Sequence, residues 1–235
     1  MRPSRLLPLV VLLSSLAGCA FHPPEGKKGD EEIPEATTPA QLMVRFERVY
    51  ELQSLVKYEP LLTSDFRYTF SSASDPNLVT QYGDNWGKDD EVESTKHLFE
   101  GYTNTSGVVV PKASRIEMTL SGVQYQPDYE HSDSAEYYQR VIVSSVDMTI
   151  EVPTTPDPTT YAISARHEFY VVRGDAAVLD VGQEARVDRW YIRRWDDLST
   201  ALAARKSVVG TASDAPVRAF PSWGSLKVAM VAWPQ

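Results

Sequence analysis

The sequence predicts an α+β domain, and three observations lead to this class. Helical patterns come first, because residues 39–56 and 88–100 place apolar side chains at spacings of three and four. Four strand-like runs with a period of two follow them, at 113–125, 138–152, 160–173 and 184–195. Helices followed by consecutive strands are typical of α+β proteins, whereas strands alternating with helices would indicate a parallel α/β fold.

The first helix is expected over residues 39–56. Thr38 suits its N-cap, Pro39 suits its first turn, and Gln41 follows the cap by three residues. One side of this helix is apolar and carries Leu42, Phe46, Val49, Leu52 and Val56. The segment is therefore predicted to be an amphipathic helix that packs on the core.

Shorter elements lie between the first helix and the long strands. We expect a second helix over 57–63, a strand over 67–70 and a loop over 71–84. The third helix, at 88–100, has acidic residues in its first turn, which suits the helix dipole, and Gly101 follows as a C-terminal stop.

The first 18 residues have the composition of a secretory signal. Arg2 and Arg5 form a positive start, residues 6–16 are mostly apolar, and small residues precede Cys19. The apolar run is too short to cross about 30 Å of hydrocarbon, which needs about 20 residues. We therefore expect export without a permanent membrane-spanning helix.

Leu16-Ala17-Gly18-Cys19 resembles the lipobox of bacterial lipoproteins, in which the cysteine is lipidated and becomes the mature N-terminus. Cys19 is the only cysteine of the chain. The alternative is a soluble exported protein whose cysteine is incidental. Lipid chains contribute about 0.8 kcal/mol per buried methylene and would hold the body on a membrane. Ala20 stands where an aspartate usually retains such lipoproteins at the inner membrane, so we expect the outer membrane.

The mature chain is acidic, and its composition suggests the domain boundaries. Removing residues 1–18 changes the formal charge from −9 to −11, which disfavours binding to nucleic acids. Residues 19–38 contain prolines and few apolar residues, and they are expected to form a flexible tether. The folded domain is expected over 39–200. Residues 201–235 read as a linker with an apolar end, 223–227, that docks on the domain.

Several segments, in this order, resemble the nuclear transport factor 2-like, or SnoaL-like, superfamily. They are the capped first helix, Leu61–Phe66 before the first strand, Trp86-Gly87 and Leu98-Phe99 at the ends of the third helix, and Trp190–Asp196 in the last strand. The resemblance covers about 39–200. It implies a cone in which a curved antiparallel sheet wraps three N-terminal helices. WGKDDEVESTKHLFEG and a C-terminal Trp-Gly-x-x-Lys are also similar to uncharacterised bacterial lipoproteins.

Members of this superfamily include isomerases, dehydratases, cyclases and epoxide hydrolases, which place acids and bases inside the cone. In the steroid-isomerase arrangement, a tyrosine of the first helix and an aspartate after the first strand transfer the proton. The corresponding positions here hold Phe46 and Phe70, which can neither donate nor accept a proton. The residues expected to line the cone cavity are Phe46, Phe70, Trp86, Phe99, His167 and Trp190.

His167 and Asp147 are the remaining catalytic candidates. His167 shares a strand face with apolar residues, so it could point inward as an acid or base, although such a histidine is more often a hydrogen-bonded core residue. Asp147 could pair with Arg189 inside the cone, but a surface ion pair is the commoner arrangement. No metal site is expected from the histidine spacing, and no cofactor-binding or nucleophile motif is present in the sequence.

Two classes of function stay open. We favour a non-catalytic module of the cell envelope that binds a small apolar ligand or an envelope protein. The alternative is an isomerase, dehydratase or hydrolase that uses the cone cavity. A homodimer is also expected, because Val141, Val143, Tyr170 and Val172 are predicted to form an apolar face opposite the core.

Overall fold

The structure is a computed structural model, and it describes residues 33–154, 157–180, 183–200 and 217–231. These residues belong to one compact unit, Glu32–Gln235. The expected signal segment, Cys19 and most of the expected linker lie outside them. No helix in the described ranges is long and apolar enough to span a bilayer.

Helices and strands follow one another as the sequence predicts, with helices first and a meander of long strands after them. The helical elements are α1 (Pro39–Glu51), α2 (Leu55–Tyr58), η1 (Glu59–Leu61), α3 (Pro76–Tyr82), α4 (Lys88–Glu100), η2 (Tyr129–Ser134) and α5 (Trp223–Val231). The strands are β1 (Leu62–Thr69), β2 (Asn85–Gly87), β3 (Tyr102–Thr103), β4 (Val109–Val110), β5 (Arg115–Pro127), β6 (Tyr138–Val152), β7 (Thr159–Gly174), β8 (Arg186–Asp197) and β9 (Val217–Ala219).

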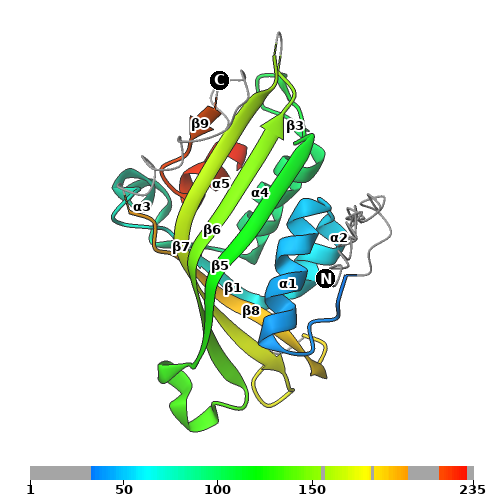
Figure 1. Cartoon of the computed structure of the whole chain (residues 1–235), viewed down its shortest axis with the longest axis vertical. Coiled ribbons are helices and arrows are strands. Elements are labelled where there is room, and N and C mark those ends of the chain that lie inside the picture. The colour runs from blue at the N-terminus through cyan, green and yellow to red at the C-terminus, as the bar shows by residue number, and fades with distance from the viewer. Residues whose placement is uncertain (1–32, 155–156, 181–182, 201–216, 232–235) are drawn as a thin grey trace, which may run out of the picture. The chain divides into compact units, whose positions relative to one another are not determined.

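The main sheet has the strand order β2-β1-β8-β7-β6-β5, and β9 pairs with β7. Strands β5 to β8 form the expected antiparallel meander, and the long strands bend along their length with α4 and α5 behind them (Figure 1). The α+β class is confirmed. The sheet is mixed rather than wholly antiparallel, because β1 runs parallel to β8 and β9 runs parallel to β7. Long connections permit such parallel pairs.

The first helix begins where the sequence predicts and ends earlier. Thr38 caps it, with its hydroxyl accepting a hydrogen bond from the Gln41 backbone N–H at 3.1 Å. The helix ends at Glu51, and Gln53 has a φ of 52°, which a right-handed helix cannot contain. The expected second helix is replaced by two short turns, α2 and η1. The expected loop at 71–84 contains α3.

The folded unit begins before the first helix. Ile33 is 7% exposed and Ala36 is 3% exposed, and the backbone N–H of Trp190 donates to the carbonyl of Ala36 at 2.8 Å. The prediction of a flexible tether over 19–38 is therefore wrong for residues 33–38. Two apolar side chains in a polar, proline-containing stretch are enough to anchor it on β8.

A β-bulge changes which side chains of β6 face the core. The pairing of β6 with β7 shifts register between Val143 and Val146, so Val141 and Val143 are fully buried like Val146. We predicted these two valines on the opposite face, because a strand without a bulge keeps strict alternation. The expected dimer through an apolar outer face loses this support.

Candidate functional site

The residues expected to line a cavity instead form a packed aromatic interior. The Phe46 ring lies 5.2 Å from the Trp195 ring and 5.3 Å from the Phe169 ring, in edge-to-face arrangements. The Phe70 ring lies 5.0 Å from that of Trp86. All six predicted side chains are buried, namely Phe46, Phe70, Trp86, Phe99, His167 and Trp190. None of them borders the outer-face pocket described below.

His167 faces this interior, but as a neutral core residue. The indole N–H of Trp195 donates to its Nδ1 at 3.0 Å, and the side chain is fully buried. Burial lowers the pKa of His167 to about 4, so the imidazole is uncharged at neutral pH. The hydrogen-bonded core interpretation is the one that the structure supports.

Asp147 lies on the outer side of the sheet. Its carboxylate is exposed and accepts a hydrogen bond from the Ser145 hydroxyl at 2.9 Å. Arg189, which we considered as its partner either inside the cone or, more commonly, at the surface, instead forms an ion pair with Glu35 at 2.6 Å. His167 is therefore the one of the two candidates that lies in the interior.

A pocket of about 250 Å³ lies on the opposite face of the sheet. We call it the outer-face pocket. Strands β1, β6, β7 and β8 form its floor and sides, and the turn of η2 forms a further wall. Its lining consists of Asp65, Arg67, Asp128, Glu130, His131, Tyr138, Tyr170, Val171, Arg193 and Arg194. None of these residues was predicted from the sequence to belong to a site.

A β-bulge places two consecutive arginines at this pocket. Tyr170 pairs with Arg194 and the next residue, Val171, pairs with Ile192, so Arg193 is the extra residue on β8. Neighbouring side chains of a regular strand point to opposite faces, but here Arg193 and Arg194 are both part-exposed and both line the pocket. Bulges often re-aim side chains near functional sites in this way.

Most charged side chains of the pocket are held by a partner of opposite charge. Arg193 Nε lies 2.6 Å from an Asp65 oxygen, and an Nη of Arg194 lies 3.2 Å from a Glu130 oxygen. The Arg194 guanidinium also stacks on the Tyr170 ring at 3.5 Å. Ion pairs and ring contacts of this kind fix the direction in which an arginine points.

Arg67 is the exception among these cations. It is exposed, and none of the described carboxylates forms an ion pair with it. In the pairing of β1 with β8, Arg67 stands directly opposite Arg194. Like charges at opposite positions repel each other, so an anion between these two guanidinium groups would be stabilised.

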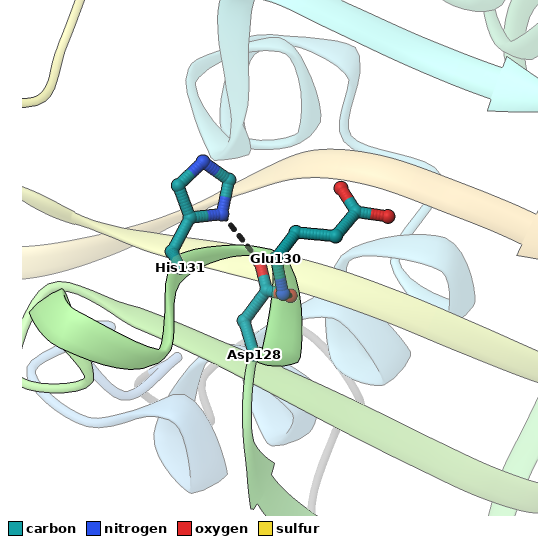
Figure 2. A group of neighbouring side chains, drawn as sticks. All are labelled: Asp128, Glu130 and His131. Carbon is teal, nitrogen blue, oxygen red and sulfur yellow. Dashed lines mark hydrogen bonds and ion pairs between the residues drawn. The ribbon is translucent and has the colours of Figure 1, made fainter.

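Asp128 and His131 form an ordered pair at the rim. The buried Asp128 carboxylate accepts from the Glu130 backbone N–H at 3.0 Å and lies 2.8 Å from His131 Nδ1, as Figure 2 shows. The imidazole stacks on the Tyr138 ring with 4.0 Å between centroids. A carboxylate that orients a histidine is an arrangement used for acid–base chemistry.

Asp128, Glu130 and His131 could also supply three ligands for a metal ion, since one ligand atom from each lies within 4.8 Å of the others. Spacings between histidines did not predict this group, because two of its three residues are carboxylates. In Figure 2 the Glu130 carboxylate points away from the imidazole, and it is bound by Arg194. The same pocket is lined by three arginines and three carboxylates, so the formal charges of its lining balance and Arg67 is the cation that no described carboxylate pairs.

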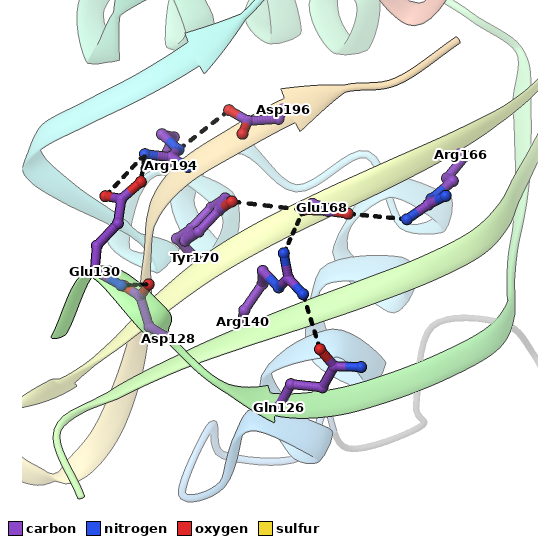
Figure 3. Close-up of polar contacts among 9 residues, drawn as sticks. All are labelled: Gln126, Asp128, Glu130, Arg140, Arg166, Glu168, Tyr170, Arg194 and Asp196. Atoms are coloured by element: carbon purple, nitrogen blue, oxygen red, sulfur yellow. Dashed lines mark hydrogen bonds and ion pairs between the residues drawn. The ribbon is translucent and has the colours of Figure 1, made fainter. Parts of the chain in front are cut away.

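The polar surface continues beyond the pocket across β6 and β7. Glu168 lies 3.0 Å from Arg166 and 3.4 Å from Arg140, and Arg140 donates to Gln126 at 2.8 Å (Figure 3). This part of the outer face is therefore a network of charged groups.

No family model matches the chain, and no curated protein matches its sequence. Solved structures with a similar fold include a putative scytalone dehydratase from Novosphingobium aromaticivorans, with 10% identity, a TM-score of 0.42 and coverage of 67% of this chain and 78% of that one. A putative polyketide cyclase from Pseudomonas putida has 10% identity and a TM-score of 0.39, and the match covers 75% of this chain and 100% of that one.

A further similar structure is an NTF2-like protein of unknown function in nutrient uptake from Rhodospirillum rubrum, with 13% identity and a TM-score of 0.39. The match covers 67% of this chain and 94% of that one. Likeness of this degree assigns neither an activity nor a ligand to the chain.

Proposed function

We propose that the chain is a lipid-anchored protein of the bacterial envelope whose domain binds a small anionic ligand in the outer-face pocket without transforming it. The observation that carries the proposal is Arg67, an exposed guanidinium opposite Arg194 with no described carboxylate as a partner. The packed aromatic interior supports it further, because the phenylalanines at the two proton-transfer positions are both buried there.

The chemistry of the lining defines the ligand class. Guanidinium groups bind carboxylates and phosphates through paired N–H donors, and these charge-assisted hydrogen bonds are stronger than neutral ones. Tyr138 and Tyr170 add ring surface beside the arginines. A pocket of about 250 Å³ suits a small molecule. This ligand is polar, in contrast to the small apolar ligand that the sequence led us to expect.

Replacing Arg67 by glutamine is expected to weaken anion binding by about tenfold or more, because a hydrogen bond to a charged group contributes about 1.5 to 3 kcal/mol. Succinate and inorganic phosphate are suitable probes, with affinity measured by isothermal titration calorimetry. The two probes also distinguish a carboxylate site from a phosphate site. Arg115→Gln makes the same charge change at an exposed site outside the pocket and is the matched control. Equal affinities for the two variants would contradict the proposal.

A second candidate is an acid–base enzyme that works at the same pocket, and the Asp128–His131 pair is the observation that favours it. Binding alone does not need this histidine as a proton carrier. Turnover that is lost in His131→Gln, in a protein that still binds the anion, would select the enzyme.

Replacing Cys19 by serine is expected to release the protein from membranes while leaving it exported. Cys19 lies outside the described residues, so this part of the proposal rests on the lipobox resemblance. Without the thiol no acyl chain can be attached, and the chain loses its membrane affinity. The measurement is fractionation of cells with and without detergent, including separation of inner and outer membranes. Ser15→Ala in the same segment is the control. Membrane association that survives Cys19→Ser would refute the anchor.

A further inference from the structure

Helix α5 carries a lysine into the aromatic interior. Figure 1 shows α5 beside α4, and the Lys227 side chain is 3% exposed. Its ammonium group forms an ion pair with the buried Glu91 carboxylate of α4. The same nitrogen lies 4.3 Å from the Trp195 ring centre, 4.8 Å from that of Tyr68 and 5.7 Å from that of Trp223.

Other groups fix the Glu91 carboxylate without the help of the lysine. The Tyr58 hydroxyl donates to it at 2.5 Å, and the Trp86 indole N–H and the Thr95 hydroxyl each donate at 3.4 Å. Glu91 itself is fully buried. The interior thus holds a Glu91 carboxylate of fixed orientation, and the Lys227 ammonium group is its cationic partner.

Helix α5 is also held at both of its ends by contacts that do not involve the Lys227 side chain. The Gly224 backbone N–H donates to Asp197 at 3.0 Å, and the Ser225 hydroxyl donates to Asp75 at 2.5 Å. Near the other end, His97 Nδ1 lies 2.9 Å from the Met230 carbonyl oxygen. Shortening the lysine should therefore leave the helix in place and open a space beside Glu91.

We propose that Glu91 and the surrounding aromatic rings form a binding site for a primary alkylammonium group, and that the chain occupies this site itself with Lys227. This site goes beyond the proposed anion-binding function and lies on the other face of the sheet. Its selectivity follows from its walls. Ring faces and a carboxylate stabilise a cation, whereas a neutral molecule of the same shape gains only apolar contact.

The test uses the full chain with Lys227→Ala. This change removes three methylenes and the ammonium group, so n-propylammonium has the matching shape, and n-propanol is its neutral counterpart. We expect n-propylammonium to raise the unfolding temperature of Lys227→Ala in a concentration-dependent manner, because a ligand that binds only the folded state stabilises it. We expect n-propanol at equal concentration and ionic strength to have no such effect.

Three further variants make the result specific to the site. Lys227→Met keeps the space filled, and Lys96→Ala shortens an exposed lysine of α4, so neither should respond to n-propylammonium. Adding Glu91→Gln to Lys227→Ala should reduce the preference for the amine over the alcohol, and the buried Asp197 carboxylate accounts for the part that remains. Equal responses to the two probes, or a response of Lys96→Ala as large as that of Lys227→Ala, would overturn the assignment.

If Lys227→Ala does not fold unaided, the yield of folded protein after refolding is measured with each probe. Recovery with n-propylammonium alone supports the site, whereas recovery with both probes or with neither overturns it.

Discussion

Replacing Lys227 by methionine is expected to lower the free energy of unfolding by about 3 to 5 kcal/mol, the usual cost of removing one partner from a buried ion pair. Methionine has a similar volume, so the loss comes from charge and not from a cavity. Glu91 is fully buried, and without the ammonium group its negative charge has only neutral hydrogen-bond donors within reach. Denaturation with urea, followed by circular dichroism, measures the change.

Two comparisons separate this effect from a general loss of a lysine. Lys96→Met changes the same residue type on the exposed side of α4 and should alter the stability by less than about 0.5 kcal/mol. Combining Glu91→Gln with Lys227→Met removes both charges and should recover part of the loss. If Lys227→Met and Lys96→Met were equally stable, the buried pair would not contribute as described.

Lowering the pH from about 6.5 to 4 is expected to cost about 3 kcal/mol of stability through His167 alone. Burial lowers the pKa of this histidine from 6.5 to about 4, and each pH unit of difference corresponds to about 1.4 kcal/mol. The unfolded chain takes up the proton more readily than the folded one in this range. The part of the free energy of unfolding that depends on a neutral His167 is therefore fully present above pH 6.5 and is lost as the pH falls towards 4.

The contribution of His167 is the difference between the pH profiles of the parent protein and His167→Gln. Glutamine can still accept the hydrogen bond from Trp195, but it does not titrate. The variant should show a shallower loss of stability between pH 6.5 and 4. Trp195→Phe removes the donor and keeps the imidazole, so its profile should keep the steeper slope. Parallel profiles for the parent and His167→Gln would contradict the neutral, buried histidine.

Local signals in the sequence were sufficient for much of the fold. Residues 88–100 and 138–152 were predicted with the boundaries that the structure has, because capping signals and periodicity act over a few neighbouring residues. The aromatic interior was also within reach, since the apolar faces of the helix and strands identified Phe46 and His167 as inward-facing. The sequence did not show whether these side chains surround an open cavity or fill the interior, because local patterns do not determine this.

The outer-face pocket depends on register, which a single sequence does not reveal. It arises where a bulge on β8 meets the parallel pairing with β1, so residues far apart in the chain, such as Arg67 and Arg194, become neighbours. One local signal was present. Arg193 and Arg194 follow each other between the buried Ile192 and Trp195, which breaks the alternation expected of a strand. This break in the alternation falls where the structure has the bulge.

The parallel pairing of β1 with β8 also has a consequence for the order in which the molecule can form. β1 has the three-residue β2 as its nearby partner, while its other edge requires a strand that is synthesised more than a hundred residues later. Contacts over such distances slow folding, because the chain must close a long loop before they stabilise it. Helix α5 is made later still. The Glu91 carboxylate therefore has no ammonium partner until the final part of the chain has arrived.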